Sequence, residues 1–423
     1  MKTLYLDNYK GFSNSFIPFT DVNFFVGENS TGKTAILNLL NILSQPNFWI
    51  SPDFNNESVE LGYFNEIVNQ YSENQSYFTI GIEGKEKKNK GSRKYLWLKF
   101  KKKNSLPYLS EYMSIIDDKT VYVTLHTSSI EYQLKDFEGE CFSEWICRSS
   151  GFHSPKKKLR KPVKTMPLAL MRGMVMSDFK GELENSQRQG IVLDSIFTNN
   201  FLWIAPIRAK AQRTYDAFKQ SFSPEGDHIP NVLRNLMSSK GKEKNAAIVD
   251  ILKHFGQESG LFDDIEIDEY GKIKGAPYGI NVLYSNLPVK ITNVGYGVSQ
   301  VMPLIVEIIT SKGDTFSIQQ PEVHLHPKAQ AAFGEFIYHS AVKSHNKFLI
   351  ETHSDYTINR FRYKLNQSDE KNKIKGQVLF FERTEHGTKV TPLEFNELGQ
   401  YPENVPDSYG NFFIDEELKM LEI

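Results

Sequence analysis

The sequence predicts an α/β protein in which helices flank a mixed central sheet and a β-rich part is inserted into the chain. Three observations predict this class. The apolar run Val22–Val26 leads through a glycine-rich turn into the helical pattern of Ala35–Leu43. Alternating apolar and polar residues recur between positions 76 and 125, as in strands of a meander. Two further short apolar runs, Thr315–Ile318 and Phe348–Ile350, are typical of buried strands.

The first 45 residues are predicted to form strand, turn, strand, loop and helix. Leu4 and Leu6 alternate with polar residues, as in a half-buried strand. The loop Gly27–Thr34 reads GENSTGKT and fits the pattern G-x-x-x-x-G-K-T. In such a loop, backbone N–H groups and the positive end of the next helix surround phosphate oxygens. Lys33 is expected to reach the β- and γ-phosphates of a nucleoside triphosphate, and Thr34 to bind Mg²⁺.

Residues 50–150 are rich in Tyr, Phe and Ser and are predicted to form a β-meander with charged loops. The expected strands are Ser76–Ile82, Tyr95–Phe100 and Lys119–Leu125. Two basic stretches, Lys85–Lys94 and Lys156–Lys164, are either solvated loops or a patch for nucleic acid or an acidic partner. Trp97 fits single-strand stacking, but strand alternation favours its burial.

The chain turns apolar again after residue 189. The expected elements are core segments at Gly190–Phe197 and Phe201–Pro206, two helices within Ile229–Phe255 joined by a charged turn, and an acidic hairpin in Asp263–Ile273. Arg208 and Arg213 lie in the loop between these elements. Because arginine binds phosphate in a bidentate manner, both are candidates for a phosphate or interface contact.

A second glycine-rich turn opens a helix within Asn293–Ile309, which reads NVGYGVSQVMPLIVEII. Backbone N–H groups and a serine hydroxyl at a helix start form an anion site by the same physics as the first loop. The alternative is an ordinary helix entry capped by Ser299.

The segment Gln319–Pro327 reads QQPEVHLHP and follows a predicted strand. Strand ends of this kind hold the Mg²⁺ shell and the attacking water in nucleotide enzymes. Glu322, His324 and His326 alternate along the segment, so a transition-metal site is an alternative. His353 follows the next strand, in the sequence ETHSD, where it is suited to sense a γ-phosphate or to position a water.

Composition limits the possible partners, metal sites and cellular location of the chain. The chain has 423 residues, with 50 Lys+Arg against 51 Asp+Glu, so any nucleic acid or acidic partner must be met by a local patch. Two cysteines, Cys141 and Cys147, provide neither a disulfide framework nor a four-ligand zinc site, and a reducing cytoplasm fits. No apolar stretch is long enough to suggest a membrane span or a signal core.

Taken in order, the motifs GENSTGKT, VGYGVSQ, QQPEVHLHP and ETHSD resemble the ABC-type ATPase head of the SMC, RecF and OLD class. They are more similar to the compact "AAA family" ATPases of bacterial anti-phage defence systems, of the Septu, PARIS or retron-associated type. The C-terminal Phe395–Phe413, FNELGQYPENVPDSYGNFF, resembles the tail of one subgroup of these ATPases. The resemblance covers residues 1–45 and about 200–423.

This resemblance implies an ABC-type head that forms a dimer with two ATP molecules sandwiched at the interface. It assigns the binding of ATP in the same subunit to Gly27, Glu28, Asn29, Ser30, Thr31, Gly32, Lys33, Thr34 and Ala35. The signature motif falls on Tyr296–Gln300, with Gly297, Ser299 and Gln300 directed to the ATP of the other subunit. His353 takes the place of the switch histidine, and His324–Pro327 that of the loop that contacts its symmetry mate.

The sequence departs from the family at the strand that usually ends in an acidic pair. Gln319 and Gln320 occupy those positions, with Gln319 as the Mg²⁺ ligand. An amide is no general base at neutral pH and holds Mg²⁺ less strongly than a carboxylate. Glu322 is the candidate for the missing carboxylate, acting with Gln320 and His353; otherwise hydrolysis is slow and ATP acts as a dimerising ligand. Gln70 is the candidate for the glutamine of the Q-loop.

The predicted organisation is a first ATPase lobe at 1–48, a β-rich part with a basic insertion at 49–198 and a second lobe at 199–423. One expected function is a cytoplasmic ATPase that forms a homodimer or higher oligomer and regulates an effector, a nuclease in a separate chain. The alternative is a RecF- or SMC-like repair ATPase that binds DNA or RNA through its basic loops. The signature and switch motifs argue against a small-molecule kinase.

Overall fold

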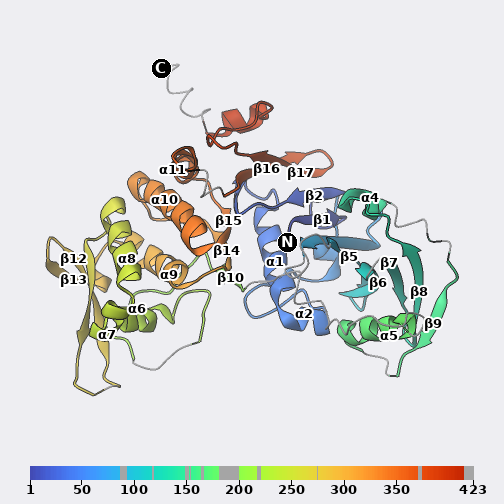
Figure 1. Ribbon diagram of the computed structural model, residues 1–423, viewed down its shortest axis with the longest axis horizontal. Helices are drawn as coiled ribbons and strands as arrows, with labels where there is room; N and C mark the ends of the chain where they lie inside the picture. The colour runs from blue at the N-terminus through green and yellow to red at the C-terminus, as the bar shows by residue number, and fades with distance from the viewer. Residues whose placement is uncertain are drawn as a thin grey trace. The chain divides into compact units, whose positions relative to one another are not determined.

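The computed structural model describes residues 1–85, 93–116, 119–147, 152, 154–162, 166–180, 200–216, 221–273, 275–369 and 374–413 (Figure 1). The chain divides into two compact units, each discontinuous in sequence. The first unit comprises Met1–Thr20, Glu28–Asn199 and Phe381–Pro392, and the second comprises Asp21–Gly27, Asn200–Phe380 and Leu393–Ile423.

The first unit is built on an antiparallel sheet with the strand order β2-β1-β4-β5-β6-β7-β8-β9. Its strands are β1 (Thr3–Asp7), β2 (Ser15–Pro18), β4 (Tyr77–Lys85), β5 (Arg93–Lys103), β6 (Leu106–Ile116), β7 (Lys119–Leu125), β8 (Ser129–Asp136) and β9 (Lys157–Arg160). Its helices are α1 (Lys33–Ser44), α2 (Pro46–Ile50), α3 (Phe64–Ile67), α4 (Phe142–Cys147) and α5 (Leu168–Lys180). The meander predicted from the alternating stretches is therefore confirmed.

Both faces of this sheet are covered, which the alternation at the N-terminus did not predict. Tyr5 is buried as well as Leu4 and Leu6, so β1 is not the half-buried strand that was expected. The Tyr5 ring packs against Phe16 with centroids 4.6 Å apart. Trp97 belongs to the same cluster and is only 8% exposed, so its indole packs in the core and offers no surface for base stacking.

The second unit contains a sheet with the strand order β10-β14-β15-β3-β16-β17. The strands are β3 (Val22–Gly27), β10 (Phe201–Ile204), β14 (Thr315–Gln319), β15 (Lys347–Glu351), β16 (Gly376–Thr384) and β17 (Gly387–Glu394). The first four strands in this order are parallel, and every residue of β3 is buried. A two-residue turn joins β16 to β17, which requires an antiparallel pair and makes the sheet mixed.

Helices and a small antiparallel sheet complete the second unit. They are α6 (Ile229–Met237), α7 (Ser239–Lys244), α8 (Ala246–Ser259), α9 (Tyr296–Thr310), α10 (Pro327–Ser344) and α11 (Asp355–Asn366), with β11 (Asp264–Glu269), β12 (Tyr278–Tyr284) and β13 (Leu287–Lys290). Apolar side chains of the parallel strands and of α8, α9, α10 and α11 form one core cluster. In Figure 1, α10 lies beside α8 on one side and α11 on the other.

The expected α/β class, a mixed sheet flanked by helices together with a β-rich part, is confirmed. The charged turn expected within Ile229–Phe255 is instead the short helix α7, because the Ser238 hydroxyl accepts a hydrogen bond from the Gly241 N–H and caps it. The core segment Gly190–Phe197 and most of the basic stretch Lys85–Lys94 lie outside the described residues. Within the described residues, no helix has the length and apolar character needed to cross a bilayer.

Candidate nucleotide site

The phosphate loop begins where the central strand of the second unit ends. β3 is buried along its whole length and stops at Gly27, and α1 starts six residues later at Lys33. The order strand, glycine-rich loop, helix is the context that the motif requires. Glu28 and the residues after it belong to the first unit.

The loop backbone has the conformation that allows N–H groups to converge. Ser30 and Gly32 both have positive φ, at 63° and 89°, and Gly27 has φ 144°. A Cβ on Gly32 would lie 2.7 Å from the Phe12 ring, so this position needs glycine for space as well as for conformation. Gly32 is the N-cap of α1, so no side chain caps this helix start. The first turn of α1 contains no acidic residue. The helix start therefore suits an anion.

Two side chains of the loop donate hydrogen bonds to one carbonyl group of the same loop. The Nζ of Lys33 donates to the Glu28 carbonyl at 2.6 Å, and the Thr31 hydroxyl donates to the same oxygen at 2.8 Å. Lys33 is only 3% exposed, whereas Thr34 is exposed, as are Glu28 and Asn29. Lys33 is thus folded onto the loop, whereas Thr34 lies at the surface.

In the second unit, the ends of β14 and β15 bring polar side chains to one edge of the sheet. Gln319 is the register partner of Glu351, and both are buried. The Gln320 N–H donates to the Glu351 carbonyl at 2.8 Å. Because residues paired in register point to the same face, Glu351 adds a carboxyl group beside Gln319 that the sequence analysis did not single out. The position of this residue at the end of a strand, in ETHSD, was the available signal.

Glu322 is hydrogen-bonded to the segment that carries His353. One carboxylate oxygen accepts from the Thr352 hydroxyl at 2.9 Å, and the other accepts from the His353 N–H at 2.7 Å. The structure therefore brings together two of the three residues that were predicted to be catalytic. A carboxylate has about four lone-pair sites, so these two bonds leave capacity to accept a further proton donor.

Burial and one buried cation act in opposite directions on the pKa of Glu322. Desolvation raises the pKa of this carboxyl above its ordinary value, and the hydrogen bonds from the His353 and Thr352 groups and the charge of Arg208 oppose the rise. Arg208 is 3% exposed, and burial lowers the pKa of its guanidinium to about 10. A raised carboxyl pKa is typical of a general base poised closer to neutral pH.

Arg208 connects helix α9 to the end of β14. Its backbone N–H and carbonyl pair with the side-chain amide of Gln300, both at 3.3 Å. Its Nη2 lies 3.5 Å from the Gln319 carbonyl, and its buried Nε has no hydrogen-bond partner. The Arg208 side chain is enclosed, and its candidacy for a phosphate or interface contact stays a prediction. Arg213 is exposed and stays a candidate.

The start of α9 has the features of an anion-binding helix end. The N-cap is Gly295, without a side-chain cap, and the first turn contains no acidic residue. A Cβ on Gly297 would lie 2.5 Å from the His324 carbonyl, so glycine allows the turn after β14 to approach the helix. Tyr296 is 49% exposed and its ring meets His324 edge-on at 4.7 Å.

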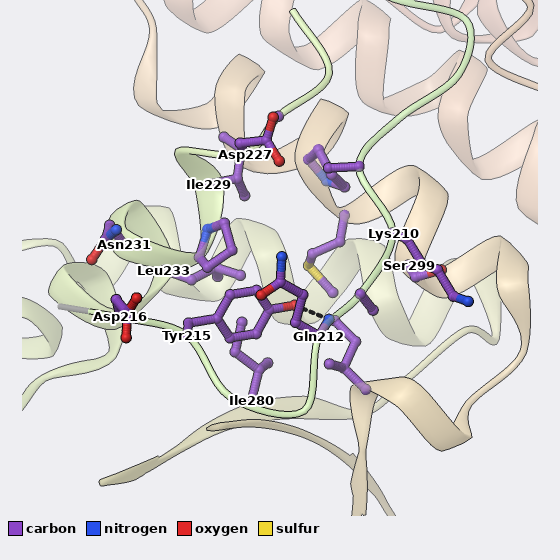
Figure 2. A pocket seen from close by; sticks show the side chains of 17 residues that line it. Lys210, Gln212, Tyr215, Asp216, Asp227, Ile229, Asn231, Leu233, Ile280 and Ser299 are labelled. Carbon is purple, nitrogen blue, oxygen red and sulfur yellow. Dashed lines mark hydrogen bonds between the residues drawn. The ribbon is translucent and has the colours of Figure 1, made fainter. Parts of the chain in front are cut away.

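Ser299 and Gln300 are both buried beneath this helix start. The Ser299 hydroxyl donates to the Tyr296 carbonyl at 2.9 Å, so the alternative of a helix cap at Ser299 is wrong. Ser299 also lines a cavity of about 110 Å³, together with polar groups of the loop that follows β10. Figure 2 shows Ser299 and Lys210 at one end of this cavity and Asp216 and Asn231 at the other.

The transition-metal alternative for QQPEVHLHP is not supported. Among the described residues, no three His, Cys, Asp or Glu side chains are grouped to hold a metal ion. The segment is also no extended strand, because Gln320 and His324 have φ of 42° and 68° and form a turn. Mg²⁺ prefers oxygen ligands and keeps several waters and phosphate oxygens, and within the second unit the Gln319 side chain and the Glu351 carboxyl group at the ends of β14 and β15 are suitable donors.

A family model described as an AAA ATPase domain matches residues 1–147 and 193–358 of the chain. No curated protein matches it. Among solved structures, the chain is similar to an SMC head bound to the C-winged helix domain of ScpA, at 12% identity and TM-score 0.44, covering 94% of this chain and 98% of that one. It is also similar to the SMC head domain from Thermotoga maritima, at 12% identity and TM-score 0.35, covering 93% and 98%. A third is an Smc head with an extended coiled coil bound to the C-terminal domain of ScpA from Pyrococcus furiosus, at 11% identity and TM-score 0.39, covering 100% and 98%.

Proposed function

Because this chain belongs to the AAA ATPase domain family, whose model matches most of its length, we propose that it binds and hydrolyses ATP and dimerises around it. The observation that carries the proposal is the phosphate loop between β3 and α1. Its backbone turns at Ser30 and Gly32, and it ends at an uncapped helix start without acidic residues. That arrangement favours a triphosphate over a neutral ligand.

The role of Lys33 follows from its present contact. Its Nζ is bonded to the Glu28 carbonyl, a neutral acceptor. A phosphate oxygen is a charged acceptor and makes a stronger bond, so Lys33 exchanges the carbonyl for the β- and γ-phosphates when ATP binds. Thr34, Gln319 and Glu351 are the residues suited to hold Mg²⁺, which neutralises charge on the phosphates.

Glu322 is the general base of the proposed reaction. It accepts a proton from the attacking water, while its bonds to Thr352 and to the His353 N–H keep the carboxylate oriented. Gln320 orients the same water, and the His353 ring meets the γ-phosphate. Since phosphoryl transfer depends mostly on positioning and charge stabilisation, a base supplied three residues after Gln319 is compatible with turnover.

Dimerisation explains why one chain has two anion-binding helix starts. The loop Gly27–Ala35 holds one ATP, and the start of α9 at Tyr296–Gln300 meets the ATP of a second subunit. Exposed apolar groups at this helix start and in the turn after β14 support the interface, since Tyr296 and Val323 are 49% and 37% exposed.

For the biological role, the resemblance to defence ATPases supports a sensor that regulates a separate effector nuclease in anti-phage defence. The alternative is a RecF- or SMC-like ATPase acting on DNA or RNA. An ATPase that is stimulated by DNA and loses this stimulation steeply with salt favours the alternative. Co-purification with a nuclease, with no response to nucleic acid, favours the defence role.

The test of the function itself is ATP binding and phosphate release by the purified chain. Lys33→Ala is expected to weaken ATP binding by at least about 100-fold, because it removes the charged contact to two phosphates. Lys102→Ala is the matched control, since Lys102 is an exposed lysine of the same unit, and it should bind ATP like the unmodified protein. Equal ATP binding by Lys33→Ala would contradict the assignment of the loop.

A further inference from the structure

The C-terminal segment Phe395–Phe413, here called the aromatic tail, packs against the second unit and reaches the predicted switch histidine. The sequence of this segment resembles the tail of one subgroup of ATPases, but the proposed reaction leaves it without a role. It follows β17 and belongs to the second unit, as do His353 and Glu322.

The start of the tail is fixed to α11, the helix that begins directly after the switch segment. The Asn396 side chain accepts from the Gln400 N–H at 2.9 Å and closes a turn, and Gly399 at its tip has φ 67°. Arg362 of α11 donates from Nε to the Gly399 carbonyl at 2.7 Å. The same guanidinium lies 3.9 Å from the Tyr401 ring centroid. A Cβ on Gly399 would lie 2.3 Å from the Arg362 carbonyl, so this approach requires glycine.

The middle of the tail is fixed to β16. Tyr409 is 5% exposed, and its hydroxyl lies 2.6 Å from the hydroxyl of Tyr401. Its ring meets Phe380 of β16 edge-on at 5.0 Å. Phe412 packs on the same Phe380 at 6.0 Å. These contacts leave the tail little freedom to shift along the sheet, because it is anchored at two elements.

At its end the tail places an aromatic ring on His353. The Phe412 and His353 rings are 6.3 Å apart with an interplanar angle of 26°, an offset stacked arrangement. The backbone N–H of His353 donates to Glu322 at 2.7 Å. The histidine is thus held from two sides, its backbone by the predicted base and its ring by the tail.

We propose that Phe412 is a positioning residue for the ATPase reaction: stacking of Phe412 on His353 keeps the imidazole in the orientation that meets the γ-phosphate. This role rests on the proposed function. A partly exposed histidine samples several χ1 and χ2 wells, and an aromatic neighbour stacked on the ring selects among them. Movement of the tail away from His353, for example by a partner that binds it, would lower turnover without touching the phosphate loop.

The test is a double-mutant cycle on Phe412 and His353, read by steady-state phosphate release and by ATP affinity. Phe412→Ala is expected to lower kcat about 5- to 10-fold, the range of one aromatic pair. ATP affinity should stay within about twofold, because the loop residues that bind the phosphates are unchanged. In the His353→Ala background, Phe412→Ala should change kcat by less than about twofold, because the residue it positions is gone.

Two further variants separate positioning from packing. Phe412→Tyr keeps the stacked ring and should restore kcat to nearly that of the unmodified protein. Phe413→Ala is the matched control, since Phe413 is the neighbouring, similarly exposed ring, which contacts Tyr409 and Phe412, and it should leave kcat within about twofold. Thermal unfolding is recorded for each, and Phe412→Leu replaces Phe412→Ala if the latter does not fold.

Several outcomes would overturn the positioning role. One is an equal loss of kcat from Phe412→Ala with and without His353, and another is a loss in Phe413→Ala as large as in Phe412→Ala. Either result, in a protein that hydrolyses ATP, leaves the proposed function intact and removes only the role of the tail. A chain that binds no ATP would instead overturn the proposed function, and the positioning role with it.

Discussion

Replacing Glu322, the predicted base, with glutamine should lower the rate of ATP hydrolysis and leave the stability of the fold almost unchanged. The two side chains have the same shape, and the amide oxygen can accept the His353 N–H as the carboxylate does. The amide N–H₂ then faces the Thr352 hydroxyl. That hydroxyl oxygen already accepts from the Ser354 N–H at 3.0 Å, and its second lone pair can accept from the new amide. The hydrogen bonds of the site can therefore be kept with one hydroxyl rotated.

The expected effects on stability and on rate differ because of this geometry. Burial of the charged carboxylate costs free energy, which is why the pKa of Glu322 is raised, and a neutral amide avoids this cost. The free energy of unfolding should therefore change by less than about 1 kcal/mol. Loss of a general base lowers a rate by about 10²- to 10⁴-fold. Glu322→Gln should therefore unfold within about 2 °C of the unmodified protein while hydrolysing ATP at least about 100-fold more slowly.

Phosphate release under single-turnover conditions, with ATP affinity measured separately, checks this prediction. Glu243→Gln, an exposed glutamate of α7, is the control for the loss of one charge. A variant Glu322→Gln that binds ATP and keeps more than about a third of the rate would refute the reasoning, since no base contributes so little. The base would then have to be sought elsewhere, with Glu351 as the next carboxyl at the strand ends.

Three other perturbations test separate parts of the site. Gly297→Ala would place a Cβ 2.5 Å from the His324 carbonyl, so we expect a loss of about 1–3 kcal/mol in unfolding free energy, measured by denaturant titration. Because the pKa of Glu322 is raised, the rate of hydrolysis should begin to fall on acidification at a pH above 4.5, the ordinary carboxyl value. A pH–rate profile measures this, and an acidic limb at or below 4.5 would contradict it. Arg208→Met removes a positive charge that opposes the rise in this pKa, so the acidic limb should move to still higher pH; an unmoved limb would mean that Arg208 does not act on Glu322.

The sequence was most informative where a local pattern implies both a conformation and a chemistry. The loop Gly27–Thr34 was predicted with its strand and helix, because glycine and lysine spacing in such a loop is dictated by phosphate geometry over a few residues. The meander of the first unit followed from alternation in the same way. Both depend on neighbours in sequence, which a single chain displays directly.

Burial that depends on contacts between residues distant in sequence was not predicted. The alternation at Leu4 and Leu6 predicted one buried face for β1, but Tyr5 is buried too, because α4 covers the face that Tyr5 shares with its neighbour Phe16. Arg208 was placed in a loop as a candidate for a phosphate or interface contact, and the sequence did not indicate that it is enclosed beside Gln300 and Gln319. Neither result could be obtained from local periodicity, since it depends on which side chains pack above the residue.

By itself the sequence predicted a phosphate loop, a second anion-binding helix start and a histidine after a buried strand. Only the tertiary structure decided what surrounds this histidine. It joined Glu322 to His353 across 31 positions and stacked the aromatic tail on the same histidine. The physical reason is that hydrogen bonds and ring contacts form between groups that the parallel strands and α11 bring together, and sequence spacing does not encode those distances.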